Sequence, residues 1–217
     1  MSDLTKWPRL IVVGQKVTEE QANEILIRTN AWQWIGGNDP AWEAQVREIT
    51  QAPSEDWYGE GPEKVRAGWA RQQEFYKSLR MIELEYLNNS RIYSSWIGGP
   101  HGWCDWDGTI GCSNYNIGKW PDVDQVRDEW KLIAAAFPFL CLTAQLVPNE
   151  GESPEAVVTF TVANGGVHVS EKRSEIIRPV IEMDVPEILR TVFSPGGERG
   201  VSPARLAAAV AQVRGAS

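Results

Sequence analysis

Residues 122–147 have the sequence DVDQVRDEWKLIAAAFPFLCLTAQLV, and this stretch decides the fold because its hydrophobic pattern changes once along its length. In the first part, apolar residues recur every three or four positions, which is the spacing of one face of a helix. These residues are Val123, Val126, Trp130, Ile133 and Phe137. Pro138 cannot continue a helix, so we predict a helix over 122–137 and a buried strand over 140–147.

The residues that follow predict two more strands. Residues 156–162 (AVVTFTV) are rich in β-branched side chains, and an acidic loop separates them from the strand before. Asn164-Gly165 is a strong signal for a tight hairpin turn, and it leads into a short strand over 167–169. We therefore expect antiparallel strands packed against the helix.

The N-terminal part predicts a strand and a helix. Residues 10–14 (LIVVG) are an apolar run of strand length that ends at a glycine. Thr18 then caps a helix, with Gln21 placed to complete a capping box. The inward positions of this helix are Ala22, Ile25 and Leu26.

The middle of the chain predicts two helices and then a hairpin. The helices cover 41–50 and 63–79, and their inward faces are Trp42, Val46 and Ile49 in the first and Val65, Trp69, Gln72 and Tyr76 in the second. Residues 81–87 and 91–97 predict two strands joined by a turn at Asn88-Asn89. A further strand over 109–117 is expected after the glycine-rich loop 98–108.

The C-terminal part differs in composition, which suggests how the chain is divided. Residues 171–200 mix charges with three prolines, and a last helix begins at Ser202-Pro203 with a weak apolar stripe. That stripe consists of Leu206, Val210 and Val213. We divide the chain into an α+β domain over 1–170, with a helical insertion at about 32–80, and a C-terminal extension over 171–217. The sequence alone does not decide whether the extension packs on the body or on a partner.

Composition narrows the class of protein. The chain of 217 residues is 42% hydrophobic and 23% charged, as in ordinary globular proteins, and its net charge of −8 disfavours direct binding to nucleic acid or to anionic membranes. Three cysteines without a repeated CxxC spacing fit a reducing compartment. The start of the chain has no signal-peptide pattern, and the longest apolar run is too short to span a bilayer. We expect a cytoplasmic protein.

Eleven tryptophans are the unusual feature of the composition. Each indole buries a large apolar area and carries one N–H that needs a hydrogen-bond acceptor. A tryptophan-rich core is one interpretation. The other is that some of the indoles line a binding surface, where tryptophan is enriched.

Residues 103–167 resemble the ferredoxin-like module of the Api92-like family, which is carried on phages and plasmids. The motifs that carry the resemblance are Trp103 to Asp107, Trp120-Pro121, Phe137-Pro138 and Asn164-Gly165. Residues 8–30 also fit the start of that family, whereas 32–79 and the last 45 residues have no counterpart. The repeated WIGG and the GWCDWD loop are similar to uncharacterised proteins of actinobacterial phages. The resemblance implies a ferredoxin-like antiparallel sheet with helices packed on one face, and it brings no activity and no catalytic residues.

The loop 98–108 (GGPHGWCDWDG) is the densest concentration of residues suited to a site. Glycines let a backbone approach a ligand closely, and indoles offer flat surfaces for stacking. The candidate ligand- or partner-binding residues are His101, Trp103, Cys104, Asp105, Trp106 and Asp107. In the alternative interpretation, the loop is an irregular connection whose tryptophans fill the core and whose aspartates cap turns.

Two kinds of chemistry can be drawn from the same loop. His101 and Cys104 suit a general base and a thiolate nucleophile. A zinc site would combine His101, Cys104 and Cys112 with either Asp107 or His168, but this spacing matches no common structural zinc pattern. We therefore predict no metal and no cofactor.

The sequence predicts a binding protein in preference to an enzyme. It contains no GxSxG, HExxH or GxGxxG motif, and its two histidines leave few options for catalysis. The expected function is that of a non-enzymatic phage-type accessory protein that binds a host protein or sequesters a small molecule. The alternatives are a small enzyme that uses the 98–108 loop and an acidic decoy of nucleic acid.

Overall fold

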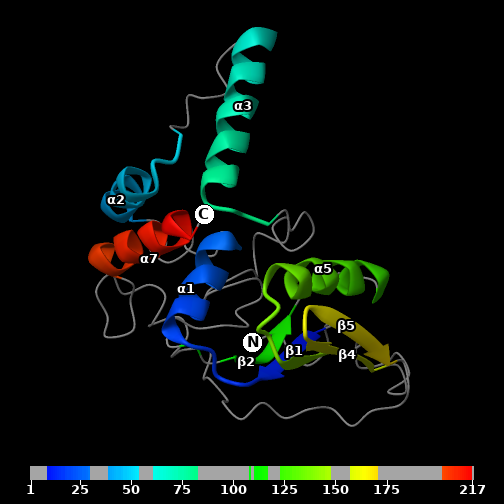
Figure 1. Ribbon diagram of the computed structural model, residues 1–217. Helices are drawn as coiled ribbons and strands as arrows, with labels where there is room; N and C mark the ends of the chain where they lie inside the picture. The colour runs from blue at the N-terminus through cyan, green and yellow to red at the C-terminus, as the bar shows by residue number, and fades with distance from the viewer. Residues whose placement is uncertain are drawn as a thin grey trace, which may run out of the picture.

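The computed structural model describes residues 9–29, 39–53, 61–82, 108, 110–116, 123–147, 157–170 and 202–216. These residues form five helices and five strands, coloured along the chain in Figure 1. In chain order the elements are β1 (Arg9–Gly14), α1 (Glu19–Arg28), α2 (Pro40–Thr50), α3 (Pro62–Ser78), β2 (Gly111–Asn116), α5 (Val123–Ala136), β3 (Leu142–Val147), β4 (Val158–Ala163), β5 (Gly166–Ser170) and α7 (Pro203–Gly215).

The strands form one sheet in the order β2-β1-β3-β4-β5, and every neighbouring pair is antiparallel. Because β1 lies between β2 and β3, the chain leaves β2, passes through α5 and re-enters the sheet on the other side of β1. The α+β class and the antiparallel sheet are therefore confirmed. The strands expected over 10–14, 109–117, 140–147, 156–162 and 167–169 correspond to these five.

The hairpin between β4 and β5 follows from its turn residues. Asn164 and Gly165 both have positive φ, 51° and 74°, as a two-residue type I′ turn requires. Ala163 then pairs with Gly166, and the register continues to Thr159 opposite Ser170. The hairpin expected from the turn signal is therefore confirmed.

One face of the sheet carries the main core. The register aligns Val12, Ala144, Phe160 and Val169 across β1, β3, β4 and β5. Side chains of α1 and α5 belong to the same buried cluster, which Trp130 joins at 2% exposure. The inward stripe expected for α5 is confirmed, since its members are buried except Val123, which is partly buried.

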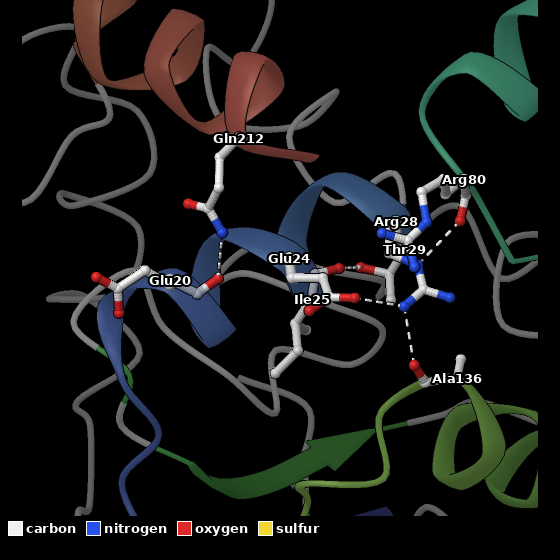
Figure 2. Close-up of polar contacts among 8 residues, drawn as sticks. All are labelled: Glu20, Glu24, Ile25, Arg28, Thr29, Arg80, Ala136 and Gln212. Carbon is white, nitrogen blue, oxygen red and sulfur yellow. Dashed lines mark hydrogen bonds and ion pairs between the residues drawn. The ribbon is translucent and has the colours of Figure 1, made fainter. Parts of the chain in front are cut away.

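A second core is built from helices. Leu26 and Ile27 lie on the side of α1 away from the first cluster and pack with residues of α2, α3 and α7. The stripe of α7 is buried here. The amide of Gln212 links α7 to α1: its Nε2 donates to the carbonyl oxygen of Glu20 over 3.0 Å (Figure 2), and its Oε1 accepts from Nδ2 of Asn23 over 3.3 Å. The C-terminal helix therefore packs on the body of the protein, against α1 and α2.

Helix α3 is present as expected, but its buried side differs from the prediction. The buried positions are Gly68 and Phe75, whereas Trp69, expected on the inward face, is 50% exposed. At 100° per residue, the buried side is rotated by roughly 70° from the predicted one. The reason is that Phe75, together with Leu79 just after the helix, enters the second core and sets the rotation of the whole helix.

Two expectations fall largely on residues outside those that the structure describes. The hairpin predicted over 81–97 lies outside the described residues except for Met81 and Ile82, which are not in a strand. Of the eleven tryptophans, three are described: Trp130 is buried, Trp42 is partly buried, and Trp69 is half exposed. A core role therefore accounts for Trp130 and Trp42 but not fully for Trp69.

The docking of α7 predicts a large effect of shortening one side chain. Leu206 is fully buried, so Leu206→Ala is expected to lower the free energy of unfolding by about 3 kcal/mol. Leu132→Ala on α5 is the matched control, because Leu132 is 50% exposed and should lose no more than about 0.5 kcal/mol. Urea denaturation measures both. Equal effects of the two substitutions would contradict the packing of α7 on the body.

Candidate binding surface on helix α3

The loop site proposed from the sequence lies outside the described residues, but its end is placed. His101 and residues 103–107 are not described, whereas Gly108 and Ile110 are. The amide of Val17 donates to the carbonyl oxygen of Gly108 over 2.7 Å, and that of Gly14 donates to Ile110 over 3.3 Å. The end of the loop is thus held against the turn between β1 and α1.

Gly108 is required at that contact, and this can be tested. Its φ is +83°, and a Cβ there would overlap the carbonyl oxygen of Val17. Gly61 has a similar φ of +94°, but the space around it is open. Gly61→Ala therefore measures the cost of placing an alanine at positive φ without any steric overlap. Gly108→Ala should therefore destabilise the protein by at least about 2 kcal/mol more than Gly61→Ala, measured by denaturant unfolding. Similar losses would mean that the contact with Val17 is not tight.

The zinc arrangement that includes His168 is wrong. Cys112 belongs to β2 and His168 to β5, at the two edges of the sheet. Four strand spacings separate them, about 19 Å, which is far beyond the reach of two ligands of one ion. Within the residues that the structure describes, no group of three or more His, Cys, Asp or Glu side chains is placed to hold a metal.

Arg28 forms a polar centre that the sequence did not predict (Figure 2). Its Nη1 donates to Oε1 of Glu24 over 2.6 Å and to the carbonyl oxygen of Ala136 over 2.8 Å, while Nε donates to the carbonyl oxygen of Arg80 over 3.0 Å. The guanidinium also lies 4.8 Å from the ring centroid of Phe137. The one sequence signal is the i,i+4 spacing of Glu24 and Arg28, because the other partners are backbone carbonyls.

These contacts explain why an arginine occupies the position. Ala136 is the last residue of α5, so its carbonyl lies at the negative end of the helix dipole, where a cation is favoured. Arg80 has a φ of 51°, and its carbonyl is available to a donor from α1. A planar guanidinium with several N–H groups satisfies a carboxylate and two carbonyls at once, which a lysine cannot do in the same geometry.

The same centre holds the C-terminal end of α3. The amide of Ile82 donates to the carbonyl oxygen of Arg28 over 2.9 Å. On the neighbouring side, Nη2 of Arg214 donates to the carbonyl oxygen of Thr50 over 2.8 Å and to Oγ of Ser78 over 3.1 Å. Two arginines and the buried Phe75 therefore fix the base of α3 to α1, α2 and α7.

The Arg28 centre predicts a strong and local dependence of stability on one side chain. Arg28→Ala removes the partners of two carbonyls and of Glu24, and should cost about 3 kcal/mol of unfolding free energy. Arg47→Ala is the matched control, since Arg47 forms the same i,i+4 pair with Glu43 on an exposed surface. That substitution should cost at most about 0.5 kcal/mol. Thermal and chemical denaturation measure the loss of unfolding free energy in both variants. Equal losses would contradict the role given to Arg28.

The rest of α3 extends away from the other described elements, with its N-terminal end farthest from the sheet (Figure 1). Arg66, Trp69, Gln73 and Lys77 are all exposed, and at 100° per residue they fall within an arc of about 80°. We call these four residues the basic-aromatic face of α3. Its one aromatic residue is Trp69, which is 50% exposed.

The charge of this helix is opposite to that of the chain. Helix α3 has four basic and two acidic residues, a net charge of +2, in a protein whose net charge is −8. Both glutamates, Glu63 and Glu74, lie outside the arc of the basic-aromatic face. Neither Arg66 nor Lys77 forms an ion pair among the described residues; Nε of Arg66 donates instead to the carbonyl oxygen of Pro62 over 3.3 Å.

Helix α5 shows the contrasting case. On its exposed side, Arg127 bonds to Asp124 and Asp128, and Lys131 bonds to Asp128 over 3.1 Å. Hydrogen bonds from Lys131 and then Arg127 lower the pKa of the Asp128 carboxyl, and the bond to Asp128 raises the pKa of Arg127. The charges on α5 therefore pair with one another. On α3, Glu63 and Glu74 lie at the same i,i+3 spacing from Arg66 and Lys77, but no ion pair forms between them among the described residues.

Comparison of the chain with protein-family models, with curated proteins and with solved structures finds no match. None of the helices that the structure describes is both long enough and apolar enough to cross a membrane. The candidate site therefore rests on its own geometry.

Proposed function

We propose that the chain is a non-enzymatic accessory protein of phage type, which acts by binding a host protein through the basic-aromatic face of α3. The observation that carries the proposal is the half-exposed indole of Trp69 on a helix whose base is fixed to the body. Tryptophan and arginine are the residues most enriched at the energetic centres of protein interfaces.

The way α3 is held favours binding. Ordering a flexible segment on association reduces affinity, and a helix with its base already fixed loses less freedom. The side chains of the face are spaced three and four residues apart, as in helices that dock on a partner through one side. Binding would therefore use a surface that is largely formed in the free protein.

A protein partner is favoured over a small molecule. Small ligands bind in concave sites that enclose most of their surface, whereas one side of a projecting helix is convex. Sequestration of a small molecule would instead depend on the loop residues His101 and Trp103 to Asp107. That loop remains a second proposed contact site, with its end held beside the start of α1 by Gly108.

We also propose that the sheet is ferredoxin-like. In a ferredoxin-like sheet, the first strand lies between the two strands that flank the second helix. The position of β1 between β2 and β3, with α5 connecting them, supports that topology, and the β4–β5 hairpin would be an addition to it. We extend this to kinship with the Api92-like family and to a place in the host cytoplasm, which the exposed free thiol of Cys141 suits.

The decoy alternative finds less support. A mimic of nucleic acid would need carboxylates in uninterrupted rows on one surface. On the exposed side of α5, Asp124 and Asp128 alternate with Arg127 and Lys131 and bond to them. The residues of the enzyme alternative, His101 and Cys104, lie outside the described part of the chain.

Site-specific photo-crosslinking tests the binding surface. A photoreactive residue in place of Gln73 should give a discrete protein adduct in bacterial cells that express the chain, and Trp69→Ala should reduce that adduct about tenfold or more. The same photoreactive residue at Leu132, which is also 50% exposed, is the control and should give no such adduct. Identical adducts at both positions, or an adduct that survives Trp69→Ala, would contradict the proposal.

A further inference from the structure

We infer that the partner contacts α3 with an acidic segment in which carboxylates flank an apolar side chain. This inference rests on the proposed function and adds the chemistry of the partner. The apolar side chain would pack on Trp69, and the carboxylates would pair with Arg66 and Lys77.

The spacing of the face defines the segment. With a rise of 1.5 Å per residue, Arg66 and Lys77 lie about 16 Å apart along the axis of α3, and Trp69 lies about 5 Å from Arg66. An extended chain covers about 16 Å in five residues, and a helix covers it in eleven. The partner segment is therefore short, with its apolar residue nearer to the carboxylate that meets Arg66.

The charge of the whole protein supports an acidic partner. Outside α3 the chain carries a net charge of −10, which follows from −8 for the whole and +2 for the helix. An acidic segment is repelled by most of this protein and attracted to the basic-aromatic face. Electrostatic complementarity of this kind selects the docking site and speeds association.

The same charges count against two other occupants. If the faces of two copies packed antiparallel, Arg66 of each would lie near Lys77 of the other, and like charges would repel. Nucleic acid is disfavoured because stable binding to a phosphate backbone uses several cations, and this face offers Arg66 and Lys77 within an acidic protein.

The test is a selection from a displayed library of random 16-residue peptides against the full chain, followed by affinity measurement on synthetic peptides. We expect the enriched peptides to be acidic with at least one large apolar residue. Each should lose at least tenfold in affinity with Trp69→Ala and with Arg66→Glu. Replacing their carboxylates by amides should have an effect of similar size, and raising the salt concentration should weaken binding.

Lys64→Glu is the matched control, because it makes the same charge change in the same turns of α3 on nearly the opposite side of the helix. It should change affinity less than threefold. Enriched peptides that depend on Trp69 but are neutral or basic would overturn the acidic partner and leave the proposed function intact. Binders that ignore Trp69→Ala, or no binders at all, would overturn both. Light scattering showing dimers lost with Arg66→Glu, or tighter binding to a 20-nucleotide DNA than to any peptide, would overturn the acidic partner in favour of a second copy or of nucleic acid.

Discussion

The guanidinium of Arg28 is the interaction on which the arrangement of the elements depends. Arg28 is the last residue of α1. Its guanidinium donates hydrogen bonds to the carbonyl oxygen of Ala136, the last residue of α5, and to the carbonyl oxygen of Arg80, which follows α3. Helix α1 lies between the two hydrophobic cores, one shared with the sheet and the other shared with α2, α3 and α7. Arg28 is therefore placed where the sheet half and the helical half of the molecule meet, and its bonds set their relation to each other.

This arrangement connects stability to the candidate surface. Helix α3 buries little of its own length, and the buried Phe75 and Leu79 lie at its C-terminal end. Arg28 and Arg214 make their polar contacts at the same end of α3. These contacts therefore fix the orientation of the exposed part of the helix. A surface indole such as that of Trp69 is useful for recognition only when the helix that carries it is held in place.

Much of the sheet and its helix followed from local patterns in the sequence. The change of period between Phe137 and Leu142 predicted α5 and β3, and Asn164-Gly165 predicted a hairpin because both positions need positive φ. The capping box of Thr18 and Gln21 is present, with each side chain bonded to the backbone of the other. Such signals act within a few residues, so the sequence shows them directly.

The rest depends on contacts between distant segments. The side of α3 that is buried is decided by where Phe75 meets the second core, and the apolar residues of the helix allow more than one choice. Arg28 donates mainly to backbone carbonyls. Every residue has a backbone carbonyl, so the sequence does not show which ones Arg28 contacts. Cys112 and His168 are far apart because their strands lie at opposite edges of the sheet. The number of residues between them in the sequence does not show this. The loop at 98–107, the main candidate from the sequence, lies outside the part of the chain that the structure describes.

Residue-resolved hydrogen exchange on Arg28→Met tests the central claim most directly. The amides of Leu79 and Ile82 bond to Phe75 and to Arg28, and they report on the base of α3, while the amides of Val12 and Ala144 report on the sheet. If Arg28 joins the two halves, exchange at Leu79 and Ile82 should quicken at least about tenfold more than at Val12 and Ala144. An equal change at all four amides, or none at the base of α3, would show that Arg28 does not hold that helix in place.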